Sequence, residues 1–186
     1  MIKPKCIVIT GRPGSGKTTL TDKLSKHLYI PKVSRDELKE GYVNTFGIKH
    51  DLLPKDTNRI VNDIFKDTVI HLLESKISLI IEAAFDHKIW EYFVSDFMKV
   101  ANVIIIICDI DVTKSALRHL ERGLANPKRE YYHGDKRVSV YRETGYFEPG
   151  EKYDLPEFDV PTLLVSTEKE YCPTIEEIET FINEDS

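Results

Sequence analysis

Apolar residues occur along this chain as short continuous runs, separated by longer stretches in which they are regularly spaced. Short runs rich in β-branched residues are typical of strands that are buried on both faces of a sheet. Four such runs predict strands, and a weaker fifth contains a proline that fits only at the start or edge of a strand. The four runs are residues 5–10, 78–83, 102–108 and 162–166, and the weaker run is residues 30–34.

The stretches between these runs show the period of an amphipathic helix. Leu20, Leu24 and Leu28 recur every fourth residue after the first run, and similar stripes cover residues 60–73, 89–100 and 175–182. This alternation implies right-handed βαβ crossovers and a parallel sheet covered by helices on both faces. The sequence therefore predicts a three-layer α/β fold, and we expect residues 1–186 to form a single domain.

Residues 123–156 interrupt the alternation, because they combine glycines, prolines, tyrosines and charges with little periodicity. A loop of this length in a compact domain is usually functional or disordered, and the aromatic residues argue against disorder. We therefore predict a mobile lid over about residues 122–156 rather than a plain surface excursion.

The first predicted strand leads into a glycine-rich segment that matches G-x-x-x-x-G-K-[ST] in full. Glycines let the backbone approach a phosphate closely, and successive N–H groups then point into an anion-binding nest at a helix N-terminus. Lys17 adds a charge at the β- and γ-phosphates, and Thr18 offers a hydroxyl to magnesium. The predicted nucleotide-binding residues are Gly11, Pro13, Gly14, Ser15, Gly16, Lys17, Thr18 and Thr19.

Two absences bear on the use of the bound triphosphate. A GTP-binding switch needs a base-reading N/T-K-x-D motif after a late strand, and the sequence has none. A mechanical ATPase usually ends its Walker B strand in Asp-Glu, whereas Glu82 is the single carboxylate at the corresponding strand end. Both absences favour a phosphotransferase.

Asp36 comes directly after the weak strand, at the edge of the sheet that also carries the phosphate loop. A carboxylate there can accept the proton of an acceptor hydroxyl as the oxygen attacks the γ-phosphate. Arg35, its neighbour, is a candidate for positioning the acceptor. The alternative is that Asp36 only caps the helix that begins at Glu37, but the nearby phosphate loop favours a general base.

Glu82 ends an apolar strand, where an ionised group is costly unless it is paired or near a metal. We predict that it holds magnesium together with Thr18 or contacts the acceptor, the alternative being a solvated strand end. Asp86 and Trp90 follow in the adjoining loop and helix. Both are candidates for lining the acceptor pocket, with a core position as the competing interpretation for Trp90.

Arg118 and Arg122 are four residues apart and are expected to share one helix face. Cations that lead into a lid can neutralise the charge of a phosphoryl group in transfer. We predict this catalytic role for both residues, with a solvated helix face as the alternative. Three more arginines lie within the predicted lid and are not distinguished from one another by sequence: Arg129, Arg137 and Arg142.

Composition limits the classes of partner. The formal net charge of −5 argues against a chain that mainly grips nucleic acid, because such affinity comes from clustered Lys and Arg. Three cysteines, widely spaced, indicate reduced thiols rather than disulfides or a metal cluster. The N-terminus lacks a signal-peptide pattern, and the longest apolar run is too short to span a bilayer. We expect a cytoplasmic protein with no membrane partner, and no motif indicates its oligomeric state.

Taken in order, four motifs resemble those of the small P-loop kinases grouped with zeta toxin, chloramphenicol phosphotransferase and polynucleotide kinase. They are GRPGSGKTT, VSRDEL, LIIEAAF and R-x-x-x-R-G, within about residues 5–125. The resemblance implies a P-loop NTPase fold with five parallel strands in the order 2-3-1-4-5. It also implies ATP as donor, a hydroxyl acceptor, Asp36 as base, and Arg122 acting from the lid. Glu82 departs from the family pattern, since many relatives carry Asp there, and the lid is longer than a minimal one.

The sequence thus favours an ATP-dependent phosphotransferase that uses Mg²⁺ and phosphorylates a hydroxyl of a small molecule, such as a nucleoside, a sugar-like compound or an antibiotic. Two alternatives stay open. One is a polynucleotide 5′-hydroxyl kinase, which needs a basic groove near Arg35. The other is a non-catalytic, ATP-binding regulatory or toxin-like protein.

Overall fold

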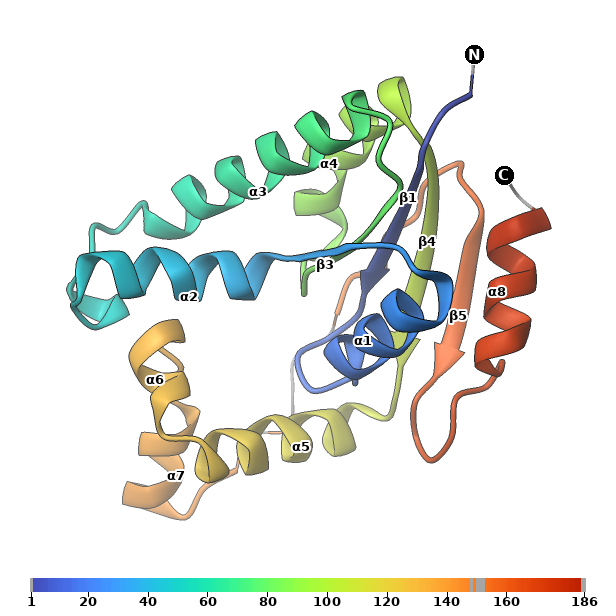
Figure 1. Ribbon diagram of the computed structural model, residues 1–186. Coiled ribbons are helices and arrows are strands. Elements are labelled where there is room, and N and C mark those ends of the chain that lie inside the picture. Colours follow the sequence, from blue (N-terminus) through green and yellow to red (C-terminus); the bar gives the residue numbers. More distant parts are fainter. Residues whose placement is uncertain (1, 148, 150–152, 185–186) are drawn as a thin grey trace.

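The computed structural model describes residues 2–147, 149 and 153–184, and its centre is a parallel sheet (Figure 1). The sheet has five strands in the order β2-β3-β1-β4-β5, and each neighbouring pair is parallel. The predicted fold class and strand order are therefore confirmed. The strands are β1 (Lys5–Thr10), β2 (Lys32–Ser34), β3 (Leu79–Glu82), β4 (Asn102–Asp109) and β5 (Thr162–Ser166).

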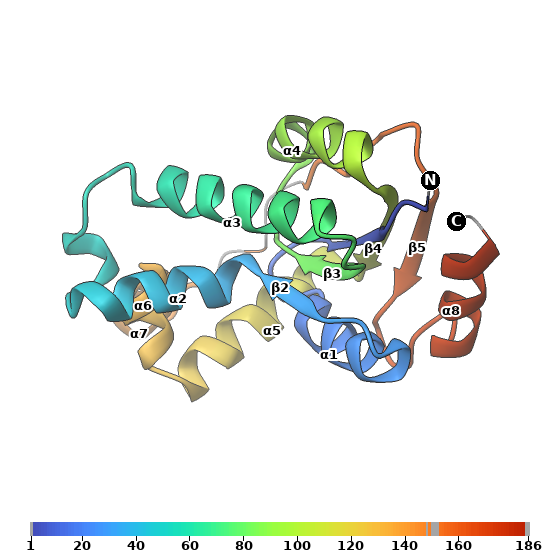
Figure 2. The ribbon, with the colours of Figure 1, turned by 45° about the horizontal axis from the view of Figure 1, so that its top comes forward.

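Alternate residues of the strands supply two separate cores. Cys6 and Val8 of β1 face one core, which is covered by α3 (Thr57–Glu74) and α4 (His87–Val100). Ile7 and Ile9 face the other, which is covered by α1 (Lys17–Leu28) and α8 (Ile175–Glu184). Figure 2 shows these helices on the two faces of the sheet. Continuous apolar strands therefore lie between two helical layers, as the sequence pattern predicts.

The carboxyl ends of the central strands are level, and this determines where the site forms. Ile9 of β1 is in register with Glu82 of β3, and Glu82 is in register with Ser34 of β2. The loop after β1, the helix α2 (Arg35–Phe46) and the end of β3 therefore meet at one edge of the sheet.

Residues 123–156 contain more regular structure than their sequence suggests. After α5 (Val112–Ala125) the chain forms two short helices, α6 (Lys128–His133) and α7 (Arg137–Thr144). Within these two helices only Val138 is buried, so there is no apolar stripe from which a helix could be predicted. Part of the predicted lid, residues 148 and 150–152, lies outside the described residues.

A short 3₁₀ helix, η1 (His50–Leu52), follows α2 and contacts α6. The lid helices thus lie opposite α2 and η1, across the edge of the sheet that carries the phosphate loop (Figure 1). Among the helices of the described residues, none combines the length and the apolar character needed to cross a membrane.

Candidate active site

The loop between β1 and α1 has the backbone of a phosphate-binding loop. Gly11, Gly14 and Gly16 have φ angles of 138°, 83° and 87°, a region that residues with a Cβ rarely adopt. Space is limited as well, because a Cβ on Gly14 would lie 2.1 Å from the carbonyl oxygen of Ser115. The glycines therefore allow the positive φ angles, and Gly14 also allows the close approach of α5.

This loop also fits an anion chemically. The N-terminus of α1 has no side-chain cap, and its first turn carries no acidic residue. The Ser15 hydroxyl is buried and has no hydrogen-bond partner among the described residues. Uncapped N–H groups and an orphan hydroxyl at a helix N-terminus are the donors that a phosphate accepts from. The residues present thus fit the triphosphate that the sequence predicts.

Lys17 is buried beside this loop, and its Nζ donates to the carbonyl oxygen of Arg12 at 2.9 Å. Burial lowers the pKa of Lys17, while the charges of Glu82 and Asp36 act in the opposite direction. A buried ammonium without an ion-pair partner among the described residues is costly. A phosphate in the loop would supply the missing negative charge.

Thr18 and Glu82 form the candidate metal site. The Thr18 hydroxyl donates to Oε1 of Glu82 at 2.8 Å, and Glu82 is only 6% exposed. Burial raises the pKa of Glu82, although the Thr18 hydrogen bond and the charge of Lys17 partly offset this. P-loop proteins hold Mg²⁺ with a loop Ser/Thr hydroxyl and a strand-end carboxylate. Glu82 has one methylene more than Asp, and its carboxylate nevertheless lies beside the Thr18 hydroxyl. The hydroxyl and carboxylate oxygens together therefore suit Mg²⁺.

A cavity of about 230 Å³ joins the phosphate loop to α2 and the lid, and we call it the transfer cavity. Lys17, Thr18 and Glu82 line one side, and Asp36 lines the side formed by α2. The Asp36 carboxyl is about half exposed to this space. Burial acts to raise the pKa of Asp36, but the charges of His133, Arg35 and Lys17 outweigh this and lower it. Asp36 is therefore ionised at neutral pH, as a general base must be.

Arg35 and Asp36 have different tasks in the fold. Nε and Nη2 of Arg35 donate to the side chains of Asn62 and Asn58, both at 3.0 Å. Its Nη1 lies 3.6 Å from Asp36. Ser34, not Asp36, precedes the first residue of α2 and occupies the N-cap position. The alternative in which Asp36 caps the helix is therefore wrong, and its carboxyl stays available to the cavity.

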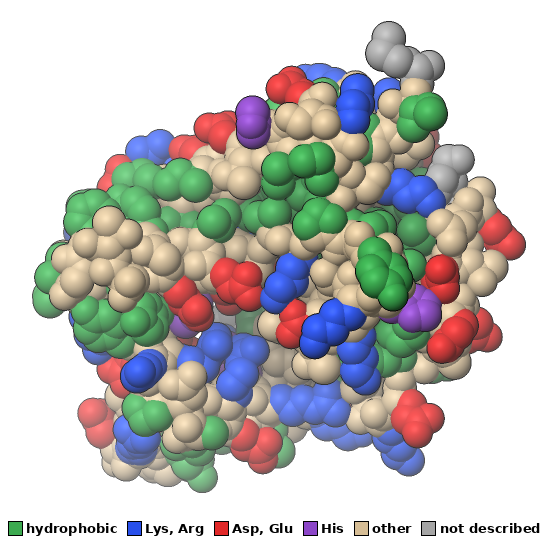
Figure 3. Space-filling model, viewed as in Figure 1, with side chains coloured by type: hydrophobic (Ala, Val, Ile, Leu, Met, Phe, Trp, Pro, Cys, Tyr) green, Lys and Arg blue, Asp and Glu red, His purple; other side chains and the backbone are tan. Residues whose placement is uncertain are grey.

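Residues at the start of the predicted lid line the transfer cavity opposite the phosphate loop. Arg122 of α5 and Arg129 of α6 both line it, together with His119, His133 and Asp135. Burial lowers the pKa of Arg122, and the charge of Arg129 adds to this effect. Two guanidinium groups that face one cavity form a place suited to negative charge. Figure 3 shows Lys and Arg side chains gathered beside the hollow between α2 and the lid.

Arg118 does not share this cavity, which corrects the prediction that both arginines face the transferred group. Its Nη1 and Nη2 donate to the carbonyl oxygens of Thr167 and Glu168 at 3.0 and 2.9 Å. These two hydrogen bonds hold the guanidinium beside the loop after β5, in a separate cavity of about 530 Å³ with Gly16 and Tyr171. A spacing of four residues places Arg118 and Arg122 on one face of α5. The direction of the Arg118 side chain is determined by its hydrogen bonds to the carbonyl groups of Thr167 and Glu168.

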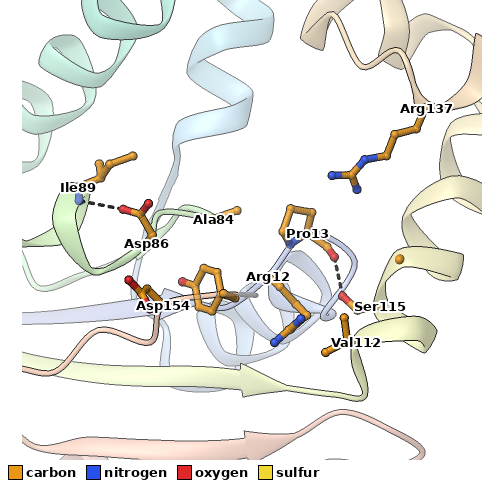
Figure 4. Close-up of a pocket in the computed structure, with 11 residues that line it drawn as sticks. Arg12, Pro13, Ala84, Asp86, Ile89, Val112, Ser115, Arg137 and Asp154 are labelled. Atoms are coloured by element: carbon orange, nitrogen blue, oxygen red, sulfur yellow. Dashed lines mark hydrogen bonds between the residues drawn. The ribbon is translucent and has the colours of Figure 1, made fainter. Parts of the chain in front are cut away.

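Asp86 and Trp90 also lie outside the transfer cavity. One carboxylate oxygen of Asp86 accepts from the N–H of Ile89 at 3.1 Å and caps α4. Figure 4 shows Asp86 across a neighbouring cavity of about 450 Å³ from Arg137; this cavity shares Pro13 and Ala84 with the transfer cavity. Trp90 is 0% exposed and cannot line an acceptor pocket, so that prediction is wrong.

A hydrogen bond satisfies the indole N–H of Trp90 in the core. Its Nε1 donates to the Thr10 hydroxyl at 2.8 Å, and the same oxygen lies 2.8 Å from the hydroxyl of Tyr153. Tyr153 also donates to the carbonyl oxygen of Phe85. A buried indole needs such a partner, and Thr10 at the end of β1 provides it.

Sequence reasoning missed several residues of the transfer cavity. Lys39 is three residues after Asp36 on α2, and this spacing alone could have placed it on the same helix face. His119 lies on α5 three residues before Arg122, and this spacing could have placed it on the same helix face. His133 and Asp135 belong to a segment without periodicity, so nothing in the sequence indicates that they turn inward. The structure distinguishes the three arginines of the predicted lid, because Arg129 lines the transfer cavity and Arg137 and Arg142 do not.

Comparison with known proteins agrees with this geometry. The fold and the phosphate loop define a protein of the P-loop NTPase fold. The sequence profile described as "AAA domain" matches residues 7–138, and the chain belongs to this family. No curated protein matches the chain in sequence.

Solved structures share the fold at low sequence identity. A provisionally assigned kinase from Chloroflexus aurantiacus has 23% identity and a TM-score of 0.75, with 100% of both chains covered. The APS kinase CysC of Mycobacterium tuberculosis, in complex with AMPPNP and APS, has 14% identity and a TM-score of 0.64, with 98% of this chain and 99% of that chain covered. A chain of the Pnkp1/Rnl/Hen1 RNA repair complex has 20% identity and a TM-score of 0.58, with 86% and 51% covered.

Proposed function

We propose that the protein is an ATP-dependent kinase that transfers the γ-phosphoryl group to a hydroxyl of a small molecule. One observation carries the proposal: an ionised carboxylate, Asp36, shares the transfer cavity with Lys17 of the phosphate loop and Arg122 of the lid. A protein that only holds nucleotide has no need of a base opposite the phosphate loop. The kinase-like fold of the compared structures supports the same conclusion.

The residues divide the reaction between them. The acceptor O–H bond breaks and its proton passes to the Asp36 carboxylate, while the oxygen forms a bond to the γ-phosphorus and the bond to the ADP oxygen breaks. Lys17, Arg122 and Arg129 compensate the charge of the phosphoryl group during transfer. Thr18 and Glu82 would hold magnesium, which supplies further charge compensation at the phosphates when bound.

The nucleotide base is expected to lie beyond the phosphate loop, next to Arg118. The cavity there is lined by Gly16, Thr19, Lys23 and Tyr171, and the fixed guanidinium of Arg118 offers a flat cation to a base. The Thr167 hydroxyl donates to the carbonyl oxygen of Ser15 at 2.7 Å, so this loop and the phosphate loop move as one unit. These contacts support nucleotide binding in this orientation, with ATP as the expected nucleotide.

A polynucleotide 5′-hydroxyl kinase is the second candidate, favoured by the structural likeness to the RNA repair complex. Two features weigh against it. The transfer cavity of about 230 Å³ is small, and the formal net charge of the chain is −5. A non-catalytic regulator is distinguished from both candidates by the absence of transfer.

A transfer assay with γ-labelled ATP tests the proposal, using nucleosides, sugars, sugar acids, aminoglycosides and a 5′-hydroxyl oligonucleotide as acceptors. Asp36→Asn is expected to lower kcat by about 10²–10⁴-fold, because it removes the base. ATP affinity, measured by calorimetry, should stay within about twofold of the wild type, since Asp36 contacts the acceptor side.

Three outcomes separate the candidates. Transfer to a small acceptor that is lost in Asp36→Asn supports the kinase. Labelling of the oligonucleotide alone, with a steep salt dependence, supports the second candidate. No transfer to any acceptor, together with equal slow ATP hydrolysis in the wild type and Asp36→Asn, contradicts both kinase functions.

A further inference from the structure

Lys39 is a buried lysine whose charge is poorly compensated. It lies one turn after Asp36 on α2, is 4% exposed, and lines the transfer cavity. The contact of its Nζ is a hydrogen bond of 3.3 Å to the backbone carbonyl oxygen of His133. Within the described part of the chain, no carboxylate lies within ion-pair distance of it. An ammonium has three donors, so most of the hydrogen-bonding capacity of Lys39 is unused.

The groups around Lys39 do not remove this deficit. Burial and, to a smaller extent, the charge of Arg35 lower the pKa of Lys39 to about 8, although Asp36 and Asp51 act to raise it. His50 of η1 and His133 of α6 are the other titratable neighbours, and both have lowered pKa values because of burial. The carboxylates nearby thus compensate the charge of Lys39 only in part.

The other cations of the transfer cavity have partners or a different task. Arg35 is bound by Asn58, Asn62 and Asp36. Lys17 and Arg122 stand where the proposed function places the phosphates of ATP. Lys39 is therefore the cation of α2 that is left for the acceptor, since it lies beside the proposed base.

We propose that the acceptor is a small hydroxyl compound that also carries a carboxylate or phosphate group, and that Lys39 binds this anionic group. This inference rests on the proposed kinase function and names its substrate class. Residues three apart on a helix have Cβ atoms about 5–6 Å from each other. The reacting hydroxyl at Asp36 and the anionic group at Lys39 are thus separated by only a few bonds. The small transfer cavity agrees with an acceptor of this size.

Arg129 strengthens the same preference from the lid. It lines the transfer cavity opposite α2, and its charge is among those that lower the pKa of Asp36. An anionic acceptor would meet a cation from each wall, whereas a neutral acceptor would leave Lys39 buried without a counter-charge. The preference therefore has two causes. The anionic group is attracted to the cations, and Lys39 is destabilised when no anion is bound to it.

The test compares matched acceptors that differ in one charged group: glycerate with glycerol, gluconate with glucose, and adenosine 3′-monophosphate with adenosine. For at least one pair, kcat/KM of the wild type is expected to be about tenfold or more higher for the anionic member. Lys39→Met should remove this preference, mainly by raising KM for the anionic member. Lys39→Arg should keep part of the preference for the anionic member, because it keeps a positive charge at this position. Lys55→Met, an exposed lysine in the connection to α3, is the control.

Two further measurements separate binding from folding and from catalysis. Lys39→Met should melt at or above the temperature of the wild type, because it removes a poorly compensated buried charge. Calorimetry near pH 8 in buffers of different ionisation enthalpy should show proton uptake when the anion binds, since the anion raises the pKa of Lys39. Lys39→Met should lose this uptake. Gluconate suits this measurement, because its carboxylate does not titrate near pH 8.

The inference and the proposed function fail in different ways. Equal kcat/KM for charged and neutral acceptors, or an anion preference that survives in Lys39→Met, overturns the inference and leaves the kinase standing. Transfer to an oligonucleotide alone overturns the small acceptor. If no acceptor is phosphorylated, the kinase function falls, and calorimetric binding that does not favour the anion over its neutral partner overturns the role of Lys39 as well.

Discussion

Asp36 and His133 line the same transfer cavity, one from α2 and one from the lid, and their charges depend on each other. Burial lowers the pKa of His133, although Asp36 and a hydrogen bond to Glu40 act to raise it. His133 is therefore largely neutral at pH 7 and becomes charged as the pH falls. Its charge is the largest of those that lower the pKa of Asp36. The base is thus protected from protonation by a neighbour that charges first.

This coupling predicts the pH dependence of the proposed reaction. A base with a lowered pKa is active above that pKa and is lost as the pH falls through it, so the acid limb of kcat should lie below the usual Asp range. His133→Gln should move the limb to higher pH, because the stabilising charge is gone. His71→Gln, an exposed histidine of α3, is the control. An acid limb that stays in place in His133→Gln would contradict the assignment of Asp36 and His133.

Single residues also show what a sequence pattern can and cannot predict. The phosphate loop was predictable residue by residue, because each part of its motif has a local reason. Asp36 and Glu82 were predictable because they end strands of one parallel sheet. The direction of Arg118 was not predictable, since two carbonyl groups about 50 residues away in sequence hold it. Trp90 was ambiguous for the same reason: its partner, Thr10, belongs to another element.

At the scale of elements, α6 is held to the opposite wall by several contacts. Lys49 and Glu130 form an ion pair of 2.8 Å, and His133 Nε2 lies 2.8 Å from Glu40. Gly134, which ends α6 with a φ of 66°, packs directly against His50 and Asp51 of η1. The contact of the predicted lid with α2 and η1 thus involves one short helix and the glycine that follows it.

Two matched glycines test this dependence. Gly134→Ala and Gly145→Ala both place a Cβ at a φ of 66°, so each should lower the stability by about 1–2 kcal/mol. A Cβ at Gly134 would lie 2.5 Å from Oδ1 of Asp51, whereas nothing lies within 4 Å of one at Gly145. Gly134→Ala should therefore also raise KM for the acceptor several-fold and increase cleavage of the lid by a protease. Equal effects of the two variants on KM would show that the η1 contact does not hold the lid.

The strands and long helices were predicted because they bury continuous or periodic apolar faces. The helices α6 and α7 were not predicted, because they cover a polar cavity rather than a core and so carry no stripe. Their glycine C-caps, Gly134 and Gly145, are local signals that could have indicated helix ends.

At the scale of the whole molecule, nucleotide binding should stabilise the fold. The loop bound by the nucleotide connects β1 to α1, and β1 pairs with both β3 and β4 in the centre of the sheet. At about 100 times its Kd, MgATP is expected to add about 2.7 kcal/mol, which raises Tm by about 5–10 °C for a chain of this size. Lys17→Met should abolish most of this shift, and the exposed Lys26→Met should not.

Trp90 provides the measurement. It is the only tryptophan of the sequence and lies fully buried on the core-facing side of α4, so its emission reports the loss of this core on heating. A Tm shift of the same size in Lys17→Met and the wild type would contradict the place assigned to the phosphates.

The Thr10 hydroxyl bears on how the sequence of this protein can change in evolution. It joins the end of β1 to Tyr153, while α5 leaves from the end of β4, the strand on the other side of the phosphate loop. The lid is therefore attached at both ends to the two strands that hold the phosphate loop. Residues between these attachments can be exchanged without moving β1 or β4. Lid residues that do not line the transfer cavity can thus vary in evolution while the phosphate loop, and Asp36 and Lys39 on α2, keep their geometry.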